Sequence, residues 1–97
     1  MNSKLRHLFQ DDQAERIHHP PYGTPEYQAM RERDRVHRQQ VQELIAAGAL
    51  HAPEDYYHAA MIFQHGESVE EIWQAYLLAI QSADLGYLRS KCDARRN

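Results

Sequence analysis

The sequence predicts an all-α protein, folded as a compact bundle of about four helices with a short N-terminal helix. Apolar residues recur in steps of three and four along most of the chain, which is the period of an amphipathic helix and not of a strand. Residues that start and stop helices separate these stretches. Only four glycines and four prolines occur in 97 residues, which favours a few long helices over a many-stranded sheet.

Length and composition indicate one folded unit. A chain of 97 residues can bury one core but not two, so we expect a single domain over residues 1–97. Hydrophobic residues make up 42% and charged residues 26%, as in ordinary globular chains, which argues against disorder. We divide the domain into four parts, in chain order: an N-terminal helix (1–16), a connector (17–25), a three-helix core (26–86) and a tail (87–97).

The first two helices are predicted from spacing and from caps. In the first, Ser3 is the expected cap, and one face carries Leu5, Leu8, Phe9 and Asp12. Two prolines and a glycine in the connector then turn the chain. The second helix has Thr24 as its expected N-cap, Pro25 at its first position and Gly48 at its end. One face of this helix carries an apolar stripe that two polar residues, Asp34 and His37, interrupt. The other members of the stripe are Tyr27, Met30, Val41 and Leu44.

The third and fourth helices carry most of the aromatic residues. The third is expected over 53–65, opened by Pro53 and closed by Gly66, and its apolar run 59–63 covers every face, so we expect it to lie between other helices. Ser68 and Glu71 form a capping-box pattern at the start of the fourth helix, which Gly86 is expected to end. Its apolar stripe is Val69, Ile72, Trp73, Tyr76, Leu77, Ile80 and Ala83. We interpret four aromatics as core or rim residues: Tyr56, Tyr57, Trp73 and Tyr76.

Charge and cysteine content restrict the partners and the compartment. Residues 51–88 contain acids but no Lys or Arg, which argues against a nucleic-acid partner on that half. A lone cysteine, Cys92, excludes an internal disulfide and a cysteine-based zinc site. The N-terminus has no apolar signal segment, and no run approaches the ~18 apolar residues of a membrane span. We therefore expect a cytoplasmic protein with no nucleic-acid or membrane partner.

Two Asp–Arg pairs at i,i+4 spacing are candidates for chemistry. Asp12 and Arg16 are interpreted as an ordinary helix ion pair. Asp34 and Arg38 have the same spacing, but Asp34 lies within an apolar stripe, and a buried carboxylate needs partners. For this second pair, a buried structural network and a functional site both remain open.

Seven histidines also raise the question of a metal site. His58 and His65 share a helix face but are about 10 Å apart along the axis, and no H-x-x-x-H spacing occurs. We expect no cofactor and no metal. The alternative is a single-metal site made across helices by His37, His58 and His65 with Asp34.

The phrase Gln64-His65-Gly66 has two interpretations. In the first it caps the third helix, with Gly66 in the left-handed conformation. In the second, Gln64 and His65 face Asp34 and Arg38 across a shallow pocket, where a histidine could act as acid or base. The candidate ligand-binding residues are Asp34, Arg38, Tyr57, His58, Gln64 and His65. No established catalytic motif accompanies them.

The order of these phrases resembles an uncharacterised bacterial family, a domain of unknown function. Asp34-Arg35 is followed by the phrase YYHAAMIFQHG over residues 56–66, which is similar to the family's Asp-Arg helix and its Tyr-x-x-Ala-x-x-x-Gln-His helix. The resemblance covers about residues 8–86 and implies an Ala-rich helix ending at a Gly. Typical members continue with a helix carrying a second Asp-Arg and a Tyr-Gly-Thr phrase, so a short or truncated member is expected here. The family brings no established activity.

Residues 57–86 are also similar to one tetratricopeptide-like helical hairpin, although a single repeat does not make a solenoid. The function we expect is a non-catalytic protein-interaction module with a protein partner, and a second copy of the chain is one candidate for that partner. Its surface would be the acidic segment 54–71 or an exposed edge of the Trp73 helix. The alternative is an enzyme or a small-ligand or metal-binding protein, with a polar site formed by Asp34, Arg38, His58, Gln64 and His65.

Overall fold

The computed structural model describes residues 1–87 and contains four helices there, which confirms the predicted all-α bundle. They are α1 (Ser3–Ile17), α2 (Pro25–Ala46), α3 (Pro53–Phe63) and α4 (Val69–Asp84). Apart from Tyr87, the expected tail at 87–97 lies outside the described residues. In the described part of the chain, no helix has the length and apolar character needed to cross a membrane.

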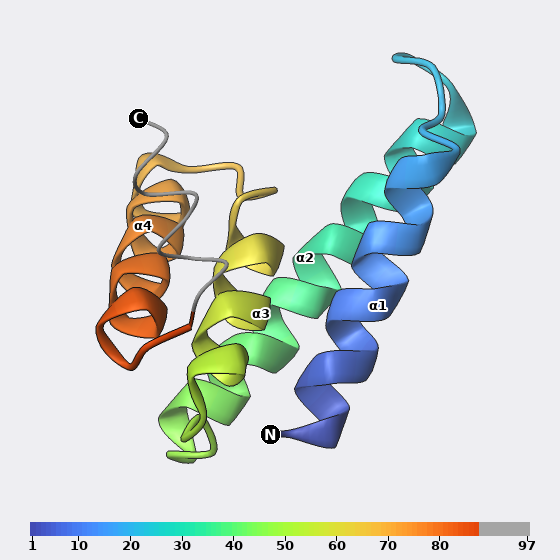
Figure 1. Ribbon diagram of the computed structural model, residues 1–97. Coiled ribbons are helices and arrows are strands. Elements are labelled where there is room, and N and C mark those ends of the chain that lie inside the picture. The colour runs from blue at the N-terminus through green and yellow to red at the C-terminus, as the bar shows by residue number, and fades with distance from the viewer. Residues whose placement is uncertain (88–97) are drawn as a thin grey trace.

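The helices form layers in chain order (Figure 1). α1 and α2 lie side by side, α3 lies against both of them, and α4 packs on the other side of α3. α3 contacts all three other helices, as its apolar run on every face predicts. Its buried residues therefore form the centre of the core: Tyr57, Ala59, Ala60, Ile62 and Phe63.

The predicted caps of α2 and α4 are confirmed, and that of α1 is wrong by one residue. Thr24 Oγ1 accepts from the backbone N–H of Tyr27 at 3.1 Å, and Ser68 Oγ accepts from that of Glu71 at 3.2 Å. In α1 the cap is Asn2, whose Oδ1 accepts from the backbone N–H of Leu5 at 2.9 Å. Ser3 is instead the first helical residue, and the backbone N–H of Arg6, which a Ser3 cap would bind, already donates to the carbonyl of Asn2 at 3.0 Å.

A buried carboxylate, Asp55, joins the starts of α1 and α3. Its Oδ1 accepts from the backbone N–H of Asn2 at 2.7 Å, and its Oδ2 accepts from those of His51 and Ala52 at 3.1 Å each. Burial raises the pKa of Asp55, but these three N–H donors outweigh it and hold the pKa below the ordinary value. A second link between helices comes from Ser82 of α4, whose Oγ donates to the carbonyl of Pro53 at 2.8 Å.

The apolar stripe of α4 faces away from the core, and the opposite face of the helix is buried. α4 buries Ala75, Leu78 and Ser82 against α3, while Trp73 and Tyr76 are 57% and 54% exposed. Trp73 and Tyr76 are therefore surface residues, and the interpretation of them as core or rim aromatics is wrong. The reason is that the Ala-rich α3 offers a flat surface, which small side chains on α4 approach most closely.

Gly66 is required for a different reason from the expected one. Its φ is not positive, whereas Gly23, Gly48 and Gly86 are the described glycines in the left-handed region. A Cβ on Gly66 would lie 2.5 Å from the Cβ of Glu71 and 3.0 Å from the carbonyl oxygen of Phe63. Close approach of the first turn of α4, and not backbone conformation, therefore excludes a side chain.

Gly66→Ala should lower the free energy of unfolding by about 1–3 kcal/mol, because the loop must move away from the Glu71 side chain on one side and from the Phe63 backbone on the other. Urea unfolding monitored by circular dichroism measures this. At a glycine with an ordinary φ and room for a Cβ, the same change would stabilise the protein by about 0.4–1 kcal/mol, because it lowers the conformational entropy of the unfolded chain. A variant more stable than wild type would therefore show that the approach is not tight.

Candidate functional site

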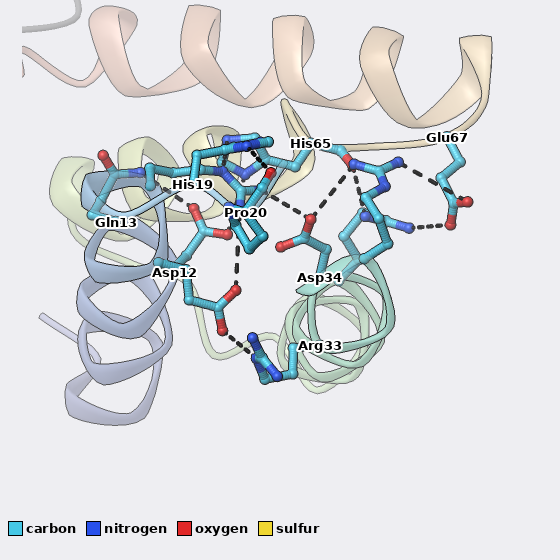
Figure 2. A network of polar contacts seen from close by, with 12 residues as sticks. Asp12, Gln13, His19, Pro20, Arg33, Asp34, His65 and Glu67 are labelled. Carbon is cyan, nitrogen blue, oxygen red and sulfur yellow. Dashed lines mark hydrogen bonds and ion pairs between the residues drawn. The ribbon is translucent and has the colours of Figure 1, made fainter. Parts of the chain in front are cut away.

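Charged side chains from three helices and one loop meet on the α2 side of the core. We call this set the polar junction. Its members come from α1, α2, the loop 64–68 and α4: Asp12, Arg16, Arg31, Asp34, Arg38, His65, Glu67 and Glu71. Figure 2 shows Asp12 and Asp34 approaching His65 from two different helices.

Helix periodicity places the buried charges. Asp12 lies seven residues after Leu5, on the same face of α1, and both are 0% exposed. Asp34 and Arg38 lie between Met30 and Val41 on the inward face of α2, where they are 1% and 3% exposed. The stripe that packs the core therefore also carries these charges into it, so each one needs a partner.

Arg16 and His65 form the centre of the junction. Arg16 Nη2 donates to Asp34 Oδ2 at 2.9 Å, and Arg16 Nε donates to His65 Nε2 at 3.2 Å. Because an arginine nitrogen only donates, Nε2 accepts, and the hydrogen of the ring lies on Nδ1. That Nδ1–H donates to Asp12 Oδ1 at 3.1 Å. One continuous chain of hydrogen bonds thus runs from α1 through the loop to α2.

Arg38 fixes the loop and the start of α4. Its guanidinium donates to Glu71 Oε2 at 2.7 Å, to the carbonyl of His65 at 2.8 Å and to Glu67 Oε1 at 3.0 Å. Burial raises the pKa of Glu71, but the backbone N–H of Glu67 and the Arg38 guanidinium outweigh it and lower the pKa below its usual range. Both carboxylates therefore remain ionised and hold the loop.

The predicted i,i+4 ion pairs are not the ones that form. Arg16 pairs with Asp34, and Asp12 pairs with His65. Arg38 likewise pairs with Glu67 and Glu71. The carboxylates point inward toward neighbouring elements and not along their own helix, so their partners come from across the bundle.

The structure brings together three of the six predicted site residues: Asp34, Arg38 and His65. Gln64 is the exposed C-cap residue of α3. His58 lies elsewhere in the core, where its ring stacks on the ring of Phe9 with 4.5 Å between the ring centroids. Tyr57 is also buried, and its ring centroid lies 6.0 Å from that of Phe9. Burial lowers the pKa of His58, which keeps its ring neutral.

Sequence reasoning missed Asp12 and Arg16 as members of the site. The signal that could have found Asp12 is its position on the Leu5 face of α1. Arg16 carries no such signal, because it is a flexible residue near the helix end and only the tertiary structure brings it to Asp34.

A metal site from His37, His58 and His65 does not form among residues 1–87. The potential ligand atoms that do converge there belong to Asp12, Asp34 and His65, and lie within 4.8 Å of one another. Arg16 already supplies the positive charge at this place, and Arg31 Nη1 lies 3.5 Å from Asp34 Oδ2. The Arg16 guanidinium would compete with a divalent cation for Asp34 Oδ2.

The junction is poorly arranged for acid–base catalysis. The lone pair of His65 Nε2, which a general base needs, is directed at Arg16 Nε. A groove of about 420 Å³ between α2 and α4 reaches Arg38 and Glu71, but Asp34, Gln64 and His65 do not line it. The Arg16 guanidinium therefore occupies the place between Asp34 and His65 where the sequence predicts a pocket. We interpret the polar junction as a structural network.

The second candidate is a surface, which we call the apolar face of α4. It consists of Val69, Ile72, Trp73, Tyr76, Leu77 and Ile80. These side chains are between 40% and 82% exposed, and the rings of Trp73 and Tyr76 are 5.2 Å apart. A shallow groove of about 440 Å³ is lined by Val69, Ile72, Trp73 and Tyr76 of this face and by the loop residues 66–68.

Comparison with known proteins found no family model, no curated protein and no solved structure that matches this chain. The resemblance to the bacterial family of unknown function therefore stays a prediction.

Proposed function

We propose that this protein is a non-catalytic interaction domain that binds a protein partner through the apolar face of α4. One observation carries the proposal: six large apolar side chains lie exposed along one face of a helix whose other face is packed on α3. A contiguous apolar patch of this kind is typical of an interaction site, whereas apolar residues scattered singly are not. Trp and Tyr at its centre are the residue types that dominate binding energy at interfaces.

The polar junction supports this proposal as a scaffold. Arg38 binds Glu67, Glu71 and the carbonyl of His65, and so fixes the first turn of α4 against α2. The buried charges of Asp34 and Arg38 are used in these internal contacts. A rigid α4 presents its face without the entropic cost of ordering it on binding.

Trp73→Ser should leave the stability of the free protein within about 0.5 kcal/mol of wild type, because Trp73 is exposed and outside the core. The same change should weaken partner binding by about 30-fold or more, as expected for an aromatic hot spot worth about 2 kcal/mol. A photo-crosslinking amino acid at Tyr76 identifies the partner, and titration calorimetry with that partner measures both affinities.

The matched control is Val36, an apolar residue of α2 that is 47% exposed. A crosslinker at Val36 should give no product, and Val36→Ser should leave affinity unchanged. Equal crosslinking from both helices, or a Trp73→Ser variant that unfolds far more easily than wild type, would contradict the proposal.

A further inference from the structure

We infer that the occupant of the apolar face of α4 is an amphipathic helix of another protein, with Lys or Arg beside its apolar stripe. This inference rests on the proposed function, because it names the partner class of the same surface. It follows from the shape of the face and from the charges at its edge.

The shape of the face fits a helix. Its apolar residues run from Val69 to Ile80, which is about three turns of α4 or about 17 Å. An open, shallow groove is lined by the first part of this face, Val69 to Tyr76, together with the loop 66–68. An amphipathic helix places its own apolar residues into such a groove at i, i+3, i+4 and i+7.

The charged residues that α4 itself places beside the face are acidic, whereas Arg35 and Arg38 of α2 line the separate groove that Glu70 and Glu71 also line. Residues 51–87 contain six acids and no Lys or Arg: Glu54, Asp55, Glu67, Glu70, Glu71 and Asp84. Inside the protein, Arg38 pairs with Glu67 and Glu71, and backbone N–H groups bind Asp55. Glu70 and Asp84 of α4 are exposed and form no ion pair with a residue of the described chain. Within residues 1–87 neither carboxylate has a cationic partner in an ion pair, so both can meet one on another protein.

Glu70 and Asp84 lie on the same flank of the apolar face. At 100° per residue, a separation of fourteen positions leaves them only about 40° apart around α4, on the side of Leu77, and about 21 Å apart along it. Asp84 also lies in the last turn of α4, which has no basic residue, so its charge adds to the negative end of the helix dipole. A partner with cations near both ends of its stripe satisfies both positions.

The same charges disfavour a second copy of this chain as the occupant. A two-fold pair of α4 helices brings identical surfaces together. Antiparallel pairing places Glu70 near Asp84 of the other copy, and parallel pairing places Glu70 near Glu70. Either arrangement sets like charges beside an apolar contact, which costs binding free energy.

The test is a selection from a displayed library of 20-residue helical peptides. Each peptide has a fixed apolar stripe and randomised flanking positions, and the target is the full chain. We expect Lys and Arg to be enriched at flanking positions about fourteen residues apart. Affinity should fall at least tenfold with Trp73→Ser, and at least tenfold with Glu70→Lys/Asp84→Lys in low salt. The charge effect should shrink in 0.5 M salt, where screening is strong.

Glu43→Lys is the matched charge control, since Glu43 is an exposed acid near the end of α2, and it should leave affinity unchanged. Selected peptides that need Trp73 but show no basic preference would overturn this inference and leave the proposed function standing. Failure to select any peptide that depends on Trp73 would overturn both. A wild-type dimer in sedimentation equilibrium that Trp73→Ser converts to monomer would also overturn the inference, because the occupant would be a second copy.

Discussion

Replacing Asp34 with alanine is expected to lower the free energy of unfolding by about 3 kcal/mol. Asp34 is 1% exposed, and its Oδ2 accepts from Arg16 and lies 3.5 Å from Arg31. Without this carboxylate, two partly buried guanidinium groups lose a charged acceptor, and one link from α1 to α2 breaks, while the exposed Arg33–Glu15 pair remains. Because a domain of this size is stable by only about 5–15 kcal/mol, urea unfolding at pH 7 will show the loss clearly.

Asp11→Ala is the matched control, because Asp11 is an exposed carboxylate on α1. Its replacement should change the free energy of unfolding by no more than about 0.5 kcal/mol. Arg16→Ala and the double variant complete a double-mutant cycle, which isolates the Arg16–Asp34 coupling from the rest of the junction. Replacing both partners by apolar residues, as in Arg16→Met/Asp34→Leu, should recover much of the loss, since no charge is then left unpaired.

The opposite result would support the alternative function. If Asp34→Ala is as stable as wild type or more stable, the junction holds strain that packing alone does not explain. A metal ion or metabolite that raises the melting temperature of wild type but not of this variant would then identify a binding site at Asp34. The proposal of a purely structural junction would be wrong.

The fold could be predicted because its signals are local. Thr24 and Ser68 cap their helices with their own side chains, Pro25 and Pro53 start helices, and Gly48 follows the end of α2 with a positive φ. Each signal acts within one turn of the chain, so one sequence is enough to find it.

The orientation of α4 could not be predicted from its own sequence. A helical period gives the direction of the apolar stripe, but it does not say whether that stripe faces the core or a partner. The decision depends on α3, whose Ala59 and Ala60 favour the small face of α4 with Ala75 and Ser82. The sequence of α4 alone contains no such information, because the contact is between helices.

The pairing within the polar junction was also beyond local reasoning. The i,i+4 spacing in α1 and α2 predicts partners on the same helix. In the structure, each of these carboxylates contacts a residue of a different element. This pairing depends on the inward direction of Asp12 and Asp34 and on the loop that brings His65 between them. What the sequence did show is that a carboxylate in an apolar stripe needs a partner, and Asp34 has one.

Asp55→Ala is expected to cost about 3 kcal/mol at pH 7, although Asp55 forms no ion pair with a side chain in the described part of the chain. It removes the acceptor of three backbone N–H groups, from Asn2, His51 and Ala52, and unpaired donors of this kind cost about 1–3 kcal/mol each when water does not reach them. Asn2 also caps α1, so the start of two helices loosens at once. Urea unfolding measures the change.

The pH dependence of this variant separates the buried carboxylate from a general packing effect. The pKa of Asp55 in the folded protein is below its ordinary value of 3.8, so on acidification the unfolded chain binds the proton first. The stabilisation from Asp55 is therefore complete above about pH 5 and is lost as the pH falls through 3.8 toward the folded pKa. The difference in the free energy of unfolding between wild type and Asp55→Ala should narrow over this range. The control is Glu54→Ala, at the preceding position of the same helix turn, which should change the free energy of unfolding by less than about 1 kcal/mol. A difference that stays constant from pH 7 to pH 3 would show that the ionised carboxylate is not what holds the two helix starts together.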